Sequence, residues 1–131
     1  MLNLKLDPRV FLLPLLTVAL SLEAQAQRTW IVDYKGGGDY KKIQDAINAA
    51  SDGDTIFVKL GGYGPCSTSK ALHFRGEESK TFPSFSKSIK VSNLRKGQTV
   101  TFQSFMTTEL SLANNAGHVH CVDVQVDGMG Q

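Results

Sequence analysis

The sequence predicts an all-β fold of the β-solenoid class, in which short parallel strands stack coil upon coil around one apolar core. Three observations support this fold class. A short strand motif recurs along the second half of the chain, its copies are spaced for coils of about 20 residues, and a short amphipathic helix precedes them. The 131 residues are enough for one small domain.

The N-terminal segment has the three parts of a secretory signal peptide. Lys5 and Arg9 give a positively charged start, and residues 10–22 are almost wholly apolar. Residues 24–26, Ala-Gln-Ala, place small side chains where a signal peptidase must accommodate them. We therefore expect cleavage after Ala26 and a secreted or extracytoplasmic mature protein. A membrane anchor is the alternative, but the apolar run falls short of the roughly 20 residues that span a bilayer.

The mature chain is predicted to open with a strand, a helix and a second strand. Residues 29–32 form a short strand-like run, which the three glycines at 36–38 end. Asp39 is expected to cap the helix. The helix has one apolar stripe with the spacing i, i+3, i+4 and i+7: Ile43, Ala46, Ile47 and Ala50. Gly53 can take the left-handed conformation that ends the helix, and residues 55–58 form the next strand.

From residue 72 onward one motif recurs, without any helical stripe. It reads apolar, any, apolar, any and then a small or polar residue, and its copies are residues 72–76, 89–93, 100–104, 110–114 and 119–123. On a strand the two apolar side chains share one face and point into a core, while the fifth position suits a corner. An apolar residue follows the corner in three copies: Leu94, Phe105 and Val124.

The spacing of the copies predicts which strands stack. Ile89 and Leu110 lie 21 positions apart, and Val100 and Val119 lie 19 apart. A coil of about 20 residues that contains two such strands is the repeat of a β-solenoid. A β-sandwich of short strands, as in a small adhesion domain, is the alternative. The middle of the chain has no Asn-Gly or Asp-Gly hairpin between matched strands, which counts against it.

Four stretches near the start carry a resemblance to a known family. They are residues 30–33 (Trp-Ile-Val-Asp), 36–40 (Gly-Gly-Gly-Asp-Tyr), 43–47 (Ile-Gln-Asp-Ala-Ile) and 51–56 (Ser-Asp-Gly-Asp-Thr-Ile). Together they resemble the N-terminal cap of the pectin-lyase-like β-helix superfamily, clearly over residues 29–59 and by pattern alone beyond. The resemblance implies a right-handed parallel β-helix of about three coils. It also implies that a short amphipathic helix plugs the open end, with Ile43, Ile47 and Ala50 covering the first coil.

The resemblance divides the chain into a signal peptide (1–26), an N-terminal cap (27–59) and incomplete β-helix coils (60–131). Residues 60–63, Leu-Gly-Gly-Tyr, replace the family's Pro-Gly-x-Tyr turn, and residues 77–87 are expected to form a projecting loop because they carry no strand motif. No C-terminal cap is recognisable. We therefore expect a truncated product or a fragment of a longer protein, whose last coil is open to self-association.

Charge and cysteine content restrict the function only weakly. The formal net charge of +2 is too small to indicate nucleic acid or an acidic polymer as a partner. After export Cys66 and Cys121 could form a disulfide. Cys66 lies in an expected loop and Cys121 in an apolar strand pattern, so two unpaired thiols with Cys121 buried are at least as well supported.

No catalytic constellation is recognisable in the sequence. The resemblance implies enzymes that act on acidic polysaccharides through Asp-bound calcium with an Arg or Lys base, or through closely placed carboxylates. Asp52 and Asp54 are expected to shape the turn after the helix rather than to bind a metal. Asp123, four positions before Asp127, fits a corner.

Besides the aspartates, the histidines are candidates for metal binding. His118 and His120 share one face of a strand, so both could bind a metal if a neighbouring coil supplied a third ligand, and nothing in the sequence nominates one. They and His73 are expected to be outward side chains. The sequence thus predicts no catalytic residue, no cofactor and no metal.

The expected function is that of a secreted β-helix segment without a complete catalytic site. It would act as an extracellular scaffold or as a module that binds polysaccharide along its parallel face. The alternative is the N-terminal fragment of a polysaccharide lyase or pectin esterase whose active site lies outside this chain. Neither nucleic acid nor, after signal cleavage, a membrane is an expected partner.

Overall fold

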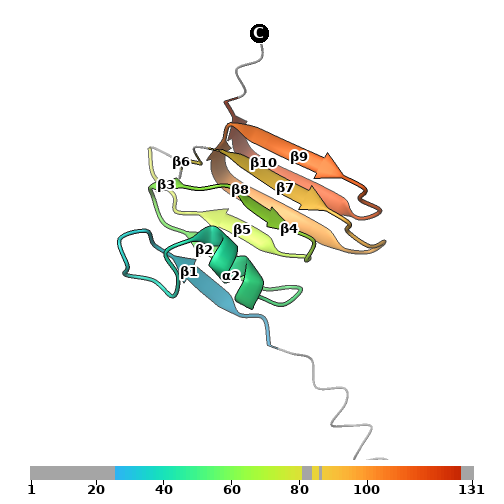
Figure 1. Cartoon of the computed structure of the whole chain (residues 1–131), viewed down its shortest axis with the longest axis horizontal. Helices are drawn as coiled ribbons and strands as arrows, with labels where there is room; N and C mark the ends of the chain where they lie inside the picture. Colours follow the sequence, from blue (N-terminus) through green and yellow to red (C-terminus); the bar gives the residue numbers. More distant parts are fainter. Residues whose placement is uncertain (1–25, 81–83, 86, 128–131) are drawn as a thin grey trace, which may run out of the picture.

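Short parallel strands stack into coils, which confirms the predicted parallel β-helix (Figure 1). The computed structural model describes residues 26–80, 84–85 and 87–127. The predicted signal peptide lies outside the described residues apart from Ala26. Every strand pair in the described part of the chain is parallel, which rules out the β-sandwich there.

The strands and the one described helix follow in this order: β1 (Thr29–Val32), α2 (Ile43–Ala49), β2 (Thr55–Val58), β3 (Gly62–Tyr63), β4 (Cys66–Thr68), β5 (His73–Gly76), β6 (Ser84–Phe85), β7 (Ser88–Ser92), β8 (Thr99–Thr107), β9 (Glu109–Ala113) and β10 (His118–Val126). The helix is too short and too polar to cross a membrane, and the described residues contain no other helix.

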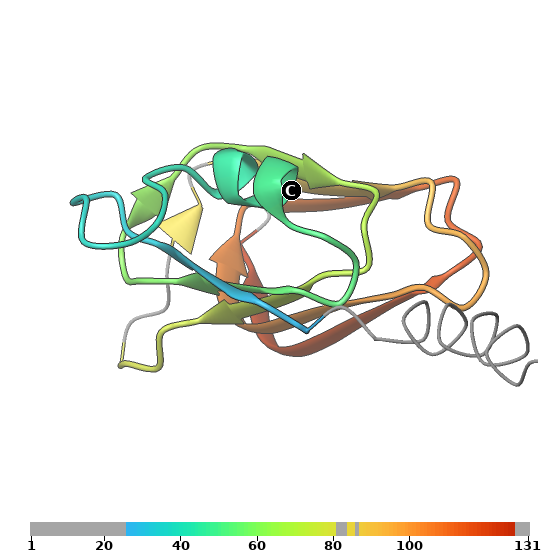
Figure 2. The same ribbon diagram turned by 90° about the horizontal axis from the view of Figure 1, so that it is seen from below.

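The strands form three faces around the core (Figure 2). The first face contains β1, β2, β5 and the first halves of β8 and β10. The second contains β3, β6 and the second halves of β8 and β10, and the third contains β4, β7 and β9. One coil therefore consists of β2, β3 and β4, the next of β5, β6 and β7, and the third of β8 and β9, after which β10 opens another.

The observed register confirms the spacing read from the sequence. Ile89 pairs with Leu110, and Val100 pairs with Val119. Because the strands are parallel and in register, side chains of the same kind stack from coil to coil, inward ones in the core and outward ones on the surface.

Four of the five predicted corner positions are confirmed by their backbone conformation, whereas the fifth, Gly76, is the last residue of β5 and lacks it. Asn93, Ser104, Asn114 and Asp123 have φ values of 60°, 59°, 52° and 52°. This left-handed conformation is one that Asn and Asp tolerate better than most residues. Ser104 and Asp123 are the points at which β8 and β10 turn from the first face to the second.

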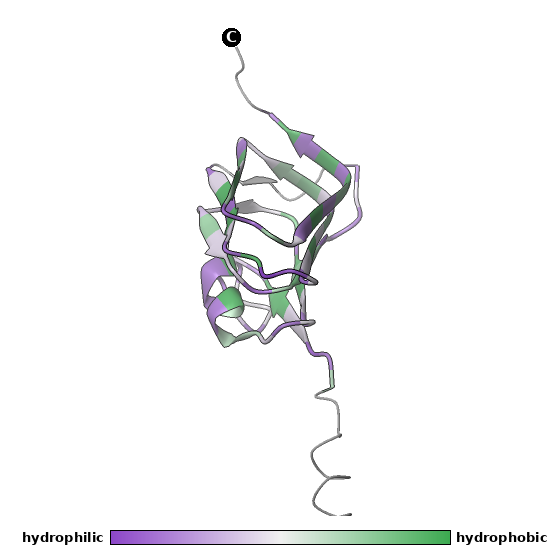
Figure 3. Ribbon diagram, turned by 90° about the vertical axis from the view of Figure 1, so that its right-hand side faces the viewer, coloured by the Kyte–Doolittle hydropathy of each residue, from purple (hydrophilic) through white to green (hydrophobic). Residues whose placement is uncertain are grey.

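Aromatic and aliphatic side chains fill the interior. The rings of Phe74 and Phe102 stack with centroids 4.8 Å apart, and Phe105 meets both edge-on at 6.4 and 6.2 Å. Apolar and polar residues alternate along the strands (Figure 3), as a strand that is buried on one face requires.

Helix α2 covers the first coil as predicted, with Ile43, Ile47 and Ala50 all buried. Its expected N-cap is wrong. The helix begins after Lys42, which makes no side-chain cap, and the Asp39 carboxylate instead accepts a hydrogen bond of 2.8 Å from the Ile31 amide. The glycine loop folds Asp39 back onto β1, where its carboxylate bonds the strand instead of the helix.

Two polar side chains, neither of them predicted, fix α2 in place. The Gln44 amide donates to the Ser67 carbonyl oxygen at 3.2 Å and accepts from the Ser67 amide at 2.8 Å, as a neighbouring strand would. The Lys70 ammonium donates to the carbonyl oxygens of Ile47, Asn48 and Ala50 at 2.7, 3.2 and 2.7 Å. These bonds supply a charged donor at the end of the helix, where the last carbonyl groups lack their usual helical partners.

Two local expectations need correction. The segment 77–87 contains β6, which pairs with β3 and β8, so it is not only a projecting loop. Both cysteines are unpaired, but their burial is the reverse of that expected: Cys66 is buried in β4 and Cys121 is exposed in β10. Cys121 points inward beside Phe102, yet no described strand covers it from the other side.

Candidate functional site

A regular array of outward side chains, most of them polar, covers the first face, and we call this surface the long outer face. Alternation along the strands turns every second residue outward, and two outward positions are shared by all five strands. The long outer face consists of Thr29, Ile31, Thr55, Phe57, His73, Arg75, Thr101, Gln103, His120 and Val122.

These side chains form two columns that run across the strands. In one column the register places threonine and histidine residues in line: Thr29, Thr55, His73, Thr101 and His120. The other contains Ile31, Phe57, Arg75, Gln103 and Val122. Neighbouring strands lie about 4.8 Å apart, so each column offers one side chain per step along a straight line.

The two columns differ in chemistry. The first column offers hydroxyl and imidazole groups. Between the neighbouring strands β5 and β8, a hydrogen bond of 3.1 Å joins His73 Nδ1 to Thr101 Oγ1. The second column contains apolar side chains and the cationic Arg75. The Arg75 guanidinium lies 3.8 Å from the Glu78 carboxylate in an exposed ion pair. None of the ten residues is acidic, so the long outer face can bind a ligand that carries neutral or anionic groups.

Asp54 has a structural role, as the sequence predicted. One carboxylate oxygen accepts from the Arg28 amide at 2.9 Å, and the other accepts from the Ser51 amide at 2.9 Å and the Trp30 indole at 3.1 Å. Burial alone would raise the pKa of Asp54, but the hydrogen bonds from Ser51, Arg28 and Trp30 outweigh it and lower the pKa. This carboxylate is engaged by three donors of its own chain.

Asp52 links its own turn to the two turns that follow it along the stack. One of its oxygens accepts from the Ala71 amide at 2.8 Å, and the other accepts from the Gln98 side chain at 3.1 Å and lies 3.7 Å from the Arg95 guanidinium. Both aspartates of the predicted turn therefore shape the loops, and they stabilise the stack.

The histidine pair lies on the outer surface of β10. His118 stands beside Thr99 and His120 beside Thr101, so the neighbouring coil offers hydroxyl groups there. Asp123 occupies its corner, and the amide of Asp127 donates to the Thr107 carbonyl oxygen at 2.8 Å. Within the described residues no three side chains of His, Cys, Asp or Glu gather as they would around a metal.

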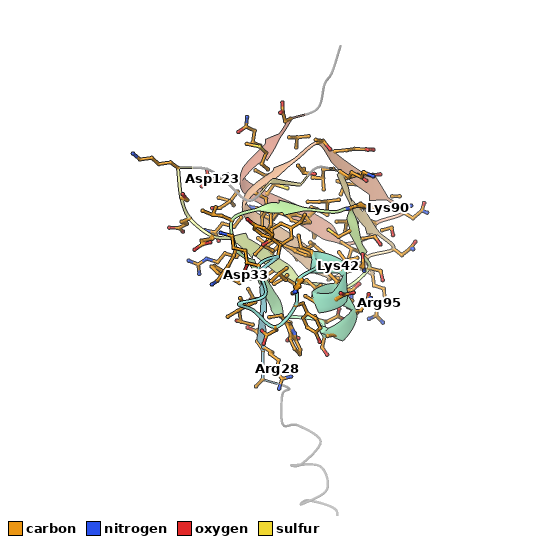
Figure 4. The ribbon with its side chains drawn as sticks, turned by 60° about the vertical axis from the view of Figure 1, so that its left-hand side comes forward. Arg28, Asp33, Lys42, Lys90, Arg95 and Asp123 are labelled. Carbon is orange, nitrogen blue, oxygen red and sulfur yellow. The ribbon has the colours of Figure 1, made fainter. Side chains whose placement is uncertain are left out.

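Charged residues are spread over the body rather than gathered in a cleft (Figure 4). Arg28 lies toward the β1 end and Asp123 toward the β10 end, while Lys90 lies on a different side from Asp33 and Asp123. A groove of about 500 Å³ borders Trp30 and is open to solvent. The polar groups that it contains include Asp52 and Asp54, which are engaged as described above.

Comparison with protein-family models, with curated proteins and with solved structures gives no match to this chain. The parallel β-helix therefore rests on the parallel, in-register strand pairing described above. The sequence identified His73 and His120 as outward residues, but it missed the columns. They become visible only once the register places residues of different coils side by side.

Proposed function

We propose that this protein is a secreted, non-catalytic β-helix module that binds extended polysaccharide along the long outer face. The two columns of in-register side chains carry this proposal, because a straight row of evenly spaced polar groups suits a linear polymer of repeating units. The resemblance of residues 29–59 to the cap of the pectin-lyase-like superfamily, whose members act on acidic polysaccharide, points to the same class of ligand.

The face offers three kinds of contact that a sugar chain can use. Hydroxyl, amide and imidazole groups can exchange hydrogen bonds with sugar hydroxyls. Phe57 and Ile31 offer apolar surface to the apolar faces of sugar rings. Arg75 can pair with a carboxylate, since its guanidinium is planar and always charged. A chain that carries uronate groups would use all three.

Binding to a panel of polysaccharides tests the proposal. The purified chain would be titrated by calorimetry with polygalacturonate, with an uncharged β-glucan and with dextran. We expect saturable binding to polygalacturonate that weakens as salt is added, because part of the attraction is between exposed charges. No binding to any member of the panel would refute the proposed function.

Substitutions on two faces locate the site. Arg75→Ala removes the cation of the long outer face and should weaken binding about tenfold, the effect of losing one hydrogen-bonded charge. Lys90→Ala removes the same charge from the third face, where Lys90 is exposed on β7, and should leave the affinity unchanged. Equal losses in both variants would show that net charge, not this face, governs binding.

The enzyme alternative predicts different outcomes of the same experiment. A polysaccharide lyase releases unsaturated uronate products that absorb in the ultraviolet, and a pectin esterase releases methanol. The proposed module binds polygalacturonate and produces neither. Turnover by the chain itself would overturn the non-catalytic part of the proposal.

Export can be tested separately. We propose that the chain is cleaved after Ala26, so the exported protein should begin at Gln27. Mass spectrometry of the protein recovered outside the producing cell measures this directly. A mature protein that still carries residues 10–22 would support the membrane anchor instead.

A further inference from the structure

The end of the stack formed by β9 and β10 presents core positions to solvent. One coil earlier these positions are buried, at Ile89, Val91, Val100, Phe102, Phe105 and Thr107. The residues paired with them form what we call the end face: Leu110, Leu112, Val119, Cys121, Val124 and Val126. All six are half-buried or exposed, with Leu112 at 54% and Val126 at 49%. None of the six is charged.

The backbone at this end has free edges as well. In the part of the chain that the structure describes, β9 pairs only with β7 and β10 pairs only with β8. Both strands lie at the end of the stack away from α2 (Figure 1). Free strand edges beside apolar side chains are a template for pairing with another strand.

At the opposite end, backbone groups on the outer edges of β4 and β1 already have partners within the chain. At β4 the Gln44 side chain occupies the amide and carbonyl of Ser67. At β1 the Ile31 carbonyl oxygen accepts from the amides of Asp39 and Tyr40 at 2.7 and 3.2 Å, and the Ile31 amide donates to Asp39. These groups are therefore not free to pair with a second copy, and α2 covers the core at that end, so the two ends of different copies do not match.

We propose that two copies of this chain associate end face to end face about a two-fold axis, with their β9 and β10 strands running antiparallel. Two identical copies that bury one surface and have no matching second surface form a closed, isologous pair. The pair buries the apolar end face of each copy and supplies partners for the free edges of β9 and β10.

Hydrogen-bonding groups favour the antiparallel arrangement, since an imidazole N–H can donate to a carboxylate. His118 and His120 lie at the start of β10, whereas Asp123 and Asp127 lie at its corner and just beyond its end. When two β10 strands run antiparallel, the histidine-bearing start of one faces the aspartate-bearing part of the other. A parallel arrangement would place the aspartates of the two strands beside each other, and like charges in register are less stable.

Sedimentation of the mature chain over a concentration series tests this proposal. We expect a reversible equilibrium between one and two copies, and a Leu112→Glu variant that remains monomeric. The substitution should raise the dissociation constant about 100-fold or more, because each pair carries it twice within the apolar contact. Leu112 is more than half exposed in the single copy, so the variant should fold.

Ser111→Glu is the matched control, since Ser111 is the neighbouring residue on β9 and points outward. It should associate like the unaltered chain. A second readout is the alkylation rate of Cys121, which should fall as the chain concentration rises. A chain that stays monomeric at near-millimolar concentration overturns the proposal. So does growth beyond two copies, because the closed α2 end would then not block stacking.

Discussion

Replacing Lys70 with methionine tests what holds the capping helix on the stack. The Lys70 ammonium donates to three carbonyl oxygens at the end of α2, at 2.7, 3.2 and 2.7 Å. A helix of seven residues is not stable on its own, and its last turn has no basic residue of its own. Methionine keeps the length and the apolar stem of the side chain and removes only the charged donor.

The magnitude follows from the three bonds and the single charge that they share. A hydrogen bond to a charged group contributes about 1.5–3 kcal/mol, and a cation at a helix C-terminus contributes about 0.3–1 kcal/mol. Because one half-buried ammonium makes all three bonds, their contributions do not add, and we expect a loss of about 2 kcal/mol. For a domain of about 100 residues this lowers Tm by about 10 °C.

Thermal unfolding followed by circular dichroism measures the effect. The control is Lys90→Met on the outside of β7, which removes the same charge from an exposed side chain and should change the free energy of unfolding by less than about 0.5 kcal/mol. In the Lys70 variant, hydrogen exchange should become faster at the amides of α2, while the amides of β8 should exchange at nearly the rate found in the unaltered chain. Equal Tm values for the two variants would refute the role given to Lys70.

Three further predictions concern other parts of the stack. Asp54→Asn removes a charge and one acceptor oxygen, and urea titration should show a loss of about 2–3 kcal/mol. Because the folded-state pKa of Asp54 is lowered, its contribution is present above the unfolded pKa of about 4 and is lost as the pH falls below it, so the variant should depend less on pH in that range. Gly117→Ala would press a methyl group against two backbone oxygens and should cost about 2 kcal/mol, whereas Gly64→Ala, which meets open space, should cost little by the same measurement. Iodoacetamide should label Cys121 in the folded protein and Cys66 only on unfolding, because Cys66 is buried and its pKa is raised to about 12.

The strand motif predicted the coils because its physical basis is local. Two alternating apolar residues followed by Asn, Ser or Asp specify a half-buried strand and a left-handed corner, and the φ values of Asn93, Ser104, Asn114 and Asp123 agree. The spacing then fixed the register, since a shift of one residue would turn every core side chain outward.

The errors and omissions concern contacts between residues far apart in the sequence. Asp39 has the right residue type for a helix cap, but its carboxylate is used by β1, eight positions earlier. Gln44 and Lys70 act on partners about 20 positions away, so no local pattern marks them. The exposure of Cys121 depends on whether another strand covers it, which its own strand motif does not specify.

The two proposals use opposite sides of the same strands, and this makes them separable. Along β10, His120 and Val122 face outward on the long outer face, while Val119 and Cys121 face inward on the end face. Arg75→Ala should therefore weaken polysaccharide binding without changing sedimentation, and Leu112→Glu should abolish pairing without changing the affinity of a single chain. Pairing would still matter for a polymer, because two linked faces bind a long chain more tightly than one when both can engage it. The Leu112→Glu chain should then bind short oligosaccharides normally and long polymers more weakly, a difference that neither loss of folding nor loss of the sugar site would produce.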